Sequence, residues 1–97
     1  MDINTLLHEG RTIWGNQKLT LSEIIIRLNV STGDLSRIAR NSNKDQAAFT
    51  QEDLERELGN IIFSTIRWCD DLGLDPKTCI ERAIECQERF AKQNSSR

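Results

Sequence analysis

The chain has 97 residues, of which 37% are hydrophobic, and this suits one compact domain near the lower limit of a self-sufficient core. Its 13 basic and 15 acidic residues are interspersed and give a net charge of −2, so it lacks the positive field that attracts nucleic acid or an anionic membrane surface. Cys69, Cys79 and Cys86 show no CxxC spacing, which argues against a disulfide framework or a zinc site. We find no signal-peptide pattern or apolar run that would span a membrane, and we expect a soluble cytoplasmic protein.

The first half of the chain predicts two helices. A short helix is expected over residues 3–14, ending before Gly15. Thr20 with Glu23 three residues later forms a capping box, and a second helix is expected over residues 21–41. The polar residues 41–49 are expected to connect it to the next helix.

The second half predicts two further helices. Thr50 with Asp53 caps a third helix over residues 51–72, and Gly73 suits the left-handed residue that follows a helix. Asp75-Pro76 then begins a fourth helix that we expect to end near residues 90–92, before a frayed tail over residues 93–97. The fold class is therefore all-α, a four-helix bundle in one domain over residues 1–97, with its core at about residues 20–90 and an antiparallel centre made by the second and third helices.

The third predicted helix is apolar on two sides. At 100° per residue, one face carries a stripe of apolar residues and Thr65. The members of this stripe are Leu54, Leu58, Ile61, Thr65, Trp68 and Leu72. Glu57 and Asn60 lie on its polar flank, whereas Phe63 and Ile66 point away from it. Because a lone small bundle would not cover both apolar sides, we expect a homodimer or a higher homo-oligomer.

Two segments resemble the all-α nucleoside triphosphate pyrophosphohydrolases, the MazG-like family. ELGNIIFSTIRWCDDLGLDPKTCIERAIECQERF is similar to the second half of that family, in which a helix reading roughly EELADVL…LADELGID precedes a closing helix. LNVSTGDL is similar to the family's LVEEVGEL segment, so the resemblance covers about residues 20–90. It implies the MazG-like bundle, dimers, and Mg²⁺-dependent hydrolysis of nucleoside triphosphates (NTPs or dNTPs) to monophosphate and pyrophosphate, often to remove surplus or non-standard nucleotides.

The resemblance also implies a metal site on the two central helices. The family's ExxE positions fall on Ser31 and Asp34, and its ExxD positions fall on Glu57 and Asn60. Carboxylates three residues apart on a helix share a face, and two such pairs make an oxygen cage for hard cations. Only two of the four positions are acidic here, and Val30 stands where the family often has a further Glu. We therefore expect Mg²⁺ or Mn²⁺ to bind weakly unless the phosphates of a nucleotide supply the missing charge.

Two function classes stay open at this point. In the first, Asp34 and Glu57 serve a pyrophosphohydrolase with a reduced, substrate-assisted metal site. In the second, they are ordinary solvated or ion-paired residues in a catalytically inactive relative that acts as a dimeric nucleotide-binding or regulatory module.

Three further residues are candidates for substrate binding. Arg27 lies one turn before Ser31 and either contacts a phosphate or pairs with Glu23 or Glu57. Trp14 and Lys18 lie at the entrance to the second helix, where an aromatic ring can stack on a base. The alternative for Trp14 is a plug in the core or an interface.

Overall fold

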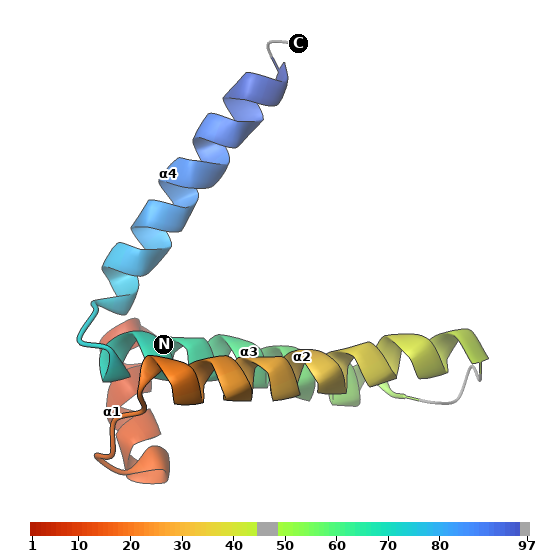
Figure 1. Cartoon of the computed structure of the whole chain (residues 1–97), viewed down its shortest axis with the longest axis horizontal. Helices are drawn as coiled ribbons and strands as arrows, with labels where there is room; N and C mark the ends of the chain where they lie inside the picture. Colours follow the sequence, from red (N-terminus) through yellow and green to blue (C-terminus); the bar gives the residue numbers. More distant parts are fainter. Residues whose placement is uncertain (45–48, 96–97) are drawn as a thin grey trace.

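The computed structural model describes residues 1–44 and 49–95. Within these ranges the chain forms four helices and no strand: α1 (Ile3–Trp14), α2 (Leu21–Lys44), α3 (Gln51–Asp71) and α4 (Pro76–Ser95). Helices α2 and α3 lie side by side and antiparallel, α1 lies at the end where α2 begins and α3 ends, and α4 leaves from that same end and projects away (Figure 1). This confirms the all-α prediction. None of the described helices has the length and apolar character needed to cross a membrane.

Local capping interactions fix most of the helix ends. The Thr20 backbone N–H donates to the Glu23 carboxylate at 3.0 Å, and the Glu23 N–H donates to the Thr20 hydroxyl at 3.3 Å. Thr50 and Asp53 make the same reciprocal pair at the start of α3. After α3, Gly73 adopts φ +76°, a conformation that side-chain-bearing residues rarely adopt. The sequence predicted each of these ends because a cap involves residues close together in the chain.

Two helices are longer than the sequence predicted. Helix α2 continues to Lys44 where we expected a connector from residue 41, and α4 continues to Ser95 where we expected an end near residues 90–92. Neither extension contains Gly or Pro, and polar residues alone do not stop a helix. The end of the fourth helix predicted near residues 90–92 is therefore wrong, and residues 96–97 of the tail and residues 45–48 of the predicted connector lie outside the described residues.

The buried core is small and lies at the end of the helix pair where α2 begins and α3 ends. Leu19, Ile24 and Trp68 form one cluster, each less than 7% exposed. The face of α3 that bears Phe63 is covered by α1, since the rings of Trp14 and Phe63 lie 4.7 Å apart between centroids. Ile66 is buried as well. The sequence argument that Phe63 and Ile66 are left uncovered within one chain is thus wrong, because it did not include α1.

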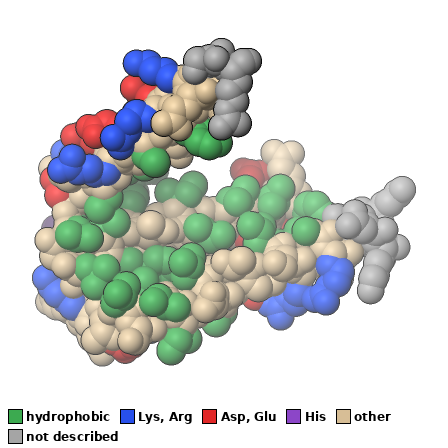
Figure 2. All heavy atoms as spheres, turned by 45° about the horizontal axis from the view of Figure 1, so that its top comes forward, with side chains coloured by type: hydrophobic (Ala, Val, Ile, Leu, Met, Phe, Trp, Pro, Cys, Tyr) green, Lys and Arg blue, Asp and Glu red, His purple; other side chains and the backbone are tan. Residues whose placement is uncertain are grey.

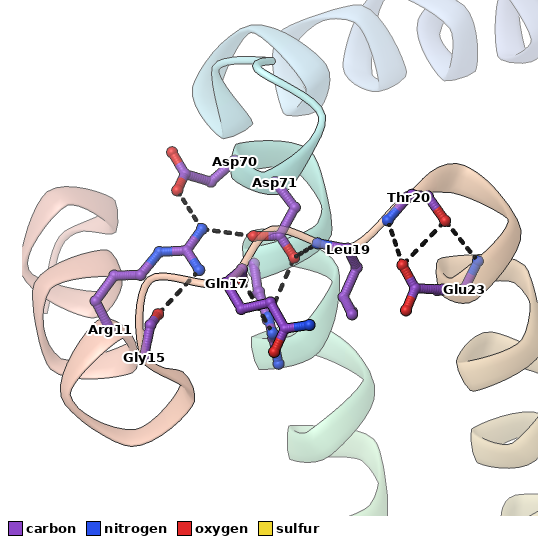
Figure 3. A network of polar contacts seen from close by, with 9 residues as sticks. Arg11, Gly15, Gln17, Leu19, Thr20, Glu23, Asp70 and Asp71 are labelled. Carbon is purple, nitrogen blue, oxygen red and sulfur yellow. Dashed lines mark hydrogen bonds and ion pairs between the residues drawn. The ribbon is translucent and has the colours of Figure 1, made fainter.

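A buried carboxylate joins three segments of the chain at this junction (Figure 3). The Asp71 side chain is fully enclosed, and its oxygens accept hydrogen bonds from Arg11 Nη2 at 2.6 Å, Arg67 Nε at 3.1 Å and the Leu19 backbone N–H at 3.2 Å. Arg11 also donates to Asp70 at 2.5 Å. Burial alone would raise the pKa of Asp71, but these hydrogen bonds and the charges of both arginines outweigh it and lower that pKa. Asp71 therefore stays ionised while it ties α1 and the connection that leads into α2 to the end of α3.

We predict that Asp71→Asn lowers the free energy of unfolding by about 3 kcal/mol, because it leaves two largely buried guanidinium groups without their shared anion. Asp70→Asn is the matched control, since this neighbouring carboxylate is more exposed and binds Arg11 alone. Asp70→Asn should lower the free energy of unfolding by less than about 1 kcal/mol. Urea denaturation of both variants measures the difference, and equal losses would contradict the assigned role of Asp71.

We predict opposite effects from two glycine substitutions in helices. A Cβ atom on Gly10 would lie 2.3 Å from the Trp14 ring, which Phe63 holds in place, whereas one on Gly33 would meet no atom within 4 Å. Gly33→Ala should stabilise the protein by about 0.5–1 kcal/mol through helix propensity. Gly10→Ala should instead destabilise it by about 1 kcal/mol, since overpacking outweighs the same gain. Thermal unfolding of the two variants gives the sign of each change in stability. Stabilisation by both substitutions would show that Trp14 does not pack on Gly10.

Candidate functional site

Asp34 and Glu57 line one pocket between α2 and α3. The antiparallel arrangement sets the second half of α2 beside the first half of α3, so residues far apart in sequence meet there. The pocket has a volume of about 400 Å³ and is open to solvent. Its lining residues are Asp34, Arg37, Ile38, Phe49, Asp53, Arg56 and Glu57. We call this the Asp34–Glu57 pocket.

The pocket combines three carboxylates with two guanidinium groups. Arg37 forms an ion pair with Asp34, and Arg56 forms one with Asp53 at 2.8 Å, each pair lying three residues apart on one helix. The Thr50 backbone N–H and then Arg56 lower the pKa of Asp53, which is also the capping residue of α3. Glu57 makes no hydrogen bond or ion pair with another described side chain. It is therefore the carboxylate of this pocket that is available to a ligand.

Ser31 and Asn60 lie near this pocket without lining it. Ser31 lines a neighbouring pocket of about 250 Å³ together with Arg27, Val30, Ser64 and Trp68. Asn60 is exposed on α3, one turn after Glu57. At 100° per residue along the antiparallel pair, both pockets fall on the same side of the two helices. The structure thus brings Asp34 and Glu57 together, with Ser31 and Arg27 further along the same side.

The protein groups in the Asp34–Glu57 pocket fit a divalent cation only in part. Among the residues that the structure describes, no group of three or more His, Cys, Asp or Glu side chains is arranged to hold a metal ion. Two carboxylates can hold Mg²⁺ when substrate phosphates and water complete its six oxygen ligands. The donor set therefore fits Mg²⁺ that arrives with a phosphate-bearing ligand better than a resident ion.

Trp14 and Lys18 do not line the Asp34–Glu57 pocket. The Trp14 side chain, at the end of α1, is half-buried against Phe63 of α3, and the guanidinium carbons of Arg11 and Arg67 lie 5.6 and 5.5 Å from its ring centroid. This supports the interpretation of Trp14 as an interface plug, and cation–π attraction adds to its packing. Lys18 is exposed on the connection between α1 and α2.

Two of the three cysteines, Cys69 and Cys79, pack as apolar groups where α3 meets α4, whereas Cys86 is exposed. Cys69 and Cys79 are half-buried and line a common groove. Burial, reinforced by the neighbouring Cys79 thiol, raises the pKa of Cys69 to about 11. A thiol with so high a pKa carries little thiolate at neutral pH and is a poor nucleophile. Cys69 is therefore a packing residue rather than a reactive thiol.

Sequence reasoning missed the polar network around Asp71. One signal for it was present, because Arg67 precedes Asp71 by four residues, a spacing at which side chains on a helix meet. The second partner, Arg11, lies on α1 and reaches Asp71 only in the folded chain. The ion pairs of Asp34 with Arg37 and of Asp53 with Arg56 have the three-residue spacing that the same rule covers.

Comparisons with protein-family models, with curated proteins and with solved structures found no match for this chain. The resemblance to MazG-like pyrophosphohydrolases therefore rests on the sequence segments alone.

Proposed function

We propose that the Asp34–Glu57 pocket binds a nucleoside triphosphate together with Mg²⁺, and that the chain is a MazG-like pyrophosphohydrolase with a reduced metal site. The observation that carries this proposal is that Asp34 and Glu57, which occupy two of the four positions that the resemblance assigns to metal ligands, line one pocket from two different helices. Arg37 and Arg56 line the same pocket. Guanidinium groups bind phosphate oxygens through paired hydrogen bonds, so the pocket offers charges of both signs that such a ligand needs.

Each residue has a defined part in this proposal. Asp34 and Glu57 hold the cation by their carboxylate oxygens, and Ser31 and Asn60 lie nearby with neutral oxygens on the same two helices. The side chains of Arg37 and Arg56 are 64% and 57% exposed, so both can turn from their carboxylate partners toward phosphate with little loss of packing. Mg²⁺, or Mn²⁺ in its place, neutralises the phosphates when bound and activates water for attack.

Substrate binding in the proposal draws on one of the three sequence candidates. Arg27 is exposed beside Ser31, on the same side of the helix pair as the Asp34–Glu57 pocket, and extends the positive charge along α2. Trp14 is occupied in the α1–α3 interface, and Lys18 lies outside the pocket lining. The proposed reaction releases pyrophosphate and a nucleoside monophosphate, and its proposed role is cytoplasmic house-cleaning.

A second function, nucleotide binding without hydrolysis, is favoured by the shortage of free negative charge in the same pocket. Asp34 and Asp53 each already have an arginine partner, and Ser31 and Asn60 carry no charge. Without enough anionic oxygen, a site binds Mg²⁺ poorly and does not position it for hydrolysis. In this case the chain binds nucleoside triphosphates through its arginines and acts as a regulatory module without turnover.

Pyrophosphate release across a panel of NTPs and dNTPs, with Mg²⁺ or Mn²⁺, tests the proposal. We expect slow hydrolysis that requires high metal concentration. Ser31→Glu combined with Asn60→Asp should raise metal affinity and turnover on the order of tenfold or more, because about 1.4 kcal/mol of added binding changes an equilibrium constant tenfold. Glu57→Gln should abolish both, whereas Glu55→Gln, an exposed residue of the same helix outside the pocket lining, should leave both unchanged.

The outcomes separate the two functions. If the rebuilt variant neither binds metal better nor hydrolyses any nucleotide, while the wild-type protein still binds triphosphates, the pyrophosphohydrolase is rejected and the binding module takes its place. If no triphosphate binds the wild-type protein with or without metal, both functions are rejected.

A further inference from the structure

Helix α4 is amphipathic, and most of its apolar side is uncovered. At 100° per residue, its charged residues occupy one side and its apolar residues form a sector on the other. The members of this sector are Cys79, Ile80, Ala83, Ile84, Cys86, Phe90 and Ala91. The first turns pack against α3, where Cys79 and Ile80 share a groove of about 390 Å³ with Ile62 and Cys69. Further along, Ile84 and Phe90 are exposed, the latter at 63%.

A matching apolar face lies on α2 and α3. Leu21, Ile25 and Leu28 of α2 and Leu58 and Ile62 of α3 are all exposed, with Ile62 at 65%. In the antiparallel pair, helical spacing places these five residues on the side of α2 and α3 that α4 touches through Cys69. We call them the apolar face. Figure 2 shows hydrophobic side chains gathered over the body of the molecule and along the side of α4 turned toward it.

The chain exposes more surface than a compact protein of its mass. Its accessible surface is 7566 Å², whereas a folded monomer of 11.1 kDa exposes roughly 5,700 Å². Its radius of gyration is 16.5 Å, whereas a compact domain of this length has about 12.5 Å. The excess surface, on the order of 1,000 to 2,000 Å², is of the size that each partner buries in an obligate dimer.

We propose that a second copy of this chain covers the apolar face, with its α4 lying across α2 and α3 of the first copy and the same contact repeated about a two-fold axis. Each chain supplies both halves of this contact, an apolar helix that projects from the body and an apolar face beside it, which is the self-complementarity that a two-fold interface requires. The amount of exposed surface matches one such copy.

The proposed interface leaves the Asp34–Glu57 pocket open. Helical spacing places Asp34 and Glu57 on the side of α2 and α3 opposite to the apolar face. Substitutions in the apolar face therefore test association without changing the proposed nucleotide site. A negative result for dimerisation would not reject nucleotide binding, and a negative result for nucleotide binding would not reject dimerisation.

Sedimentation equilibrium of the full chain tests this proposal with two matched pairs of variants. Wild-type protein at roughly 100 μM should show twice the chain mass of 11.1 kDa. Ile84→Glu and Ile25→Glu should raise the dimer dissociation constant at least about 100-fold, because each buries a charge without a partner. The controls are Arg82→Glu on the charged side of α4, and Ile26→Glu, which at 64% is more exposed than Ile25 at 50% but lies away from the apolar face. Both should leave the dissociation constant within a few-fold of wild type.

Hydrogen exchange on wild-type protein adds a measurement that needs no variant. Amides of α4 after Ala83 should be protected at high concentration and lose protection on dilution, because the second copy covers them only in the dimer.

Three results would overturn the proposal. One is a monomer at roughly 100 μM, where an interface with a dissociation constant of about 10 μM is mostly formed; the apolar face would then be left to a different protein. Another is a dimer that Ile26→Glu dissociates and Ile25→Glu does not, which would place the interface elsewhere. The third is α4 exchange that does not change with concentration.

Discussion

The ionised carboxylate of Asp71 holds together the end of the molecule where α1, α2 and α3 meet. It is enclosed at the point where α1, the connection that precedes α2 and the end of α3 meet, and it accepts a hydrogen bond or ion pair from each of them. An enclosed charge is stable only while its partners stay in place, so the contact defines one arrangement of the three segments. The small apolar cluster of Leu19, Ile24 and Trp68 completes this junction. The alignment of α2 with α3, and thus the meeting of Asp34 with Glu57 at its far end, follows from it.

The pair of α2 and α3 has two sides with different chemistry. One side carries carboxylates and guanidinium groups around a pocket, which suits a charged ligand such as a metal-bound triphosphate. The other carries exposed aliphatic residues beside a projecting amphipathic helix, which suits a second copy. A layer only two helices wide cannot bury both sides by itself. Both sides of the helix pair therefore stay exposed within one chain, and the proposals assign a charged ligand to one side and a second copy to the other.

Local interactions made much of the fold predictable from the sequence. The caps at Thr20 and Thr50 and the left-handed Gly73 depend on residues within a few positions of each other, and the structure has all three where they were expected. The end of α2 was not predictable in this way, because no glycine or proline marks it. Apolar periodicity placed Glu57 on a polar flank of α3, and the resemblance to the MazG-like family implied that Asp34 lies opposite it; both residues line one pocket.

Contacts between distant segments could not be predicted from spacing. Periodicity shows that Phe63 lies off the main stripe of α3, but only the folded chain shows that Trp14 covers it. The pairing of Arg11 with Asp71 has the same origin. The ion pair of Arg37 with Asp34 differs from these, since its three-residue spacing was visible in the sequence and it changes the charge available to a metal ion.

Nuclear magnetic resonance titration of the wild-type chain with a nucleoside triphosphate analogue that resists cleavage between the α and β phosphates tests the proposed site most directly. Backbone amide shifts should concentrate at Ser31, Asp34, Glu57 and Asn60, and adding Mg²⁺ should enlarge them because the cation and the phosphates complete each other's ligands. Shifts confined to other parts of the chain, or none at millimolar analogue with Mg²⁺, would show that α2 and α3 do not form a nucleotide site.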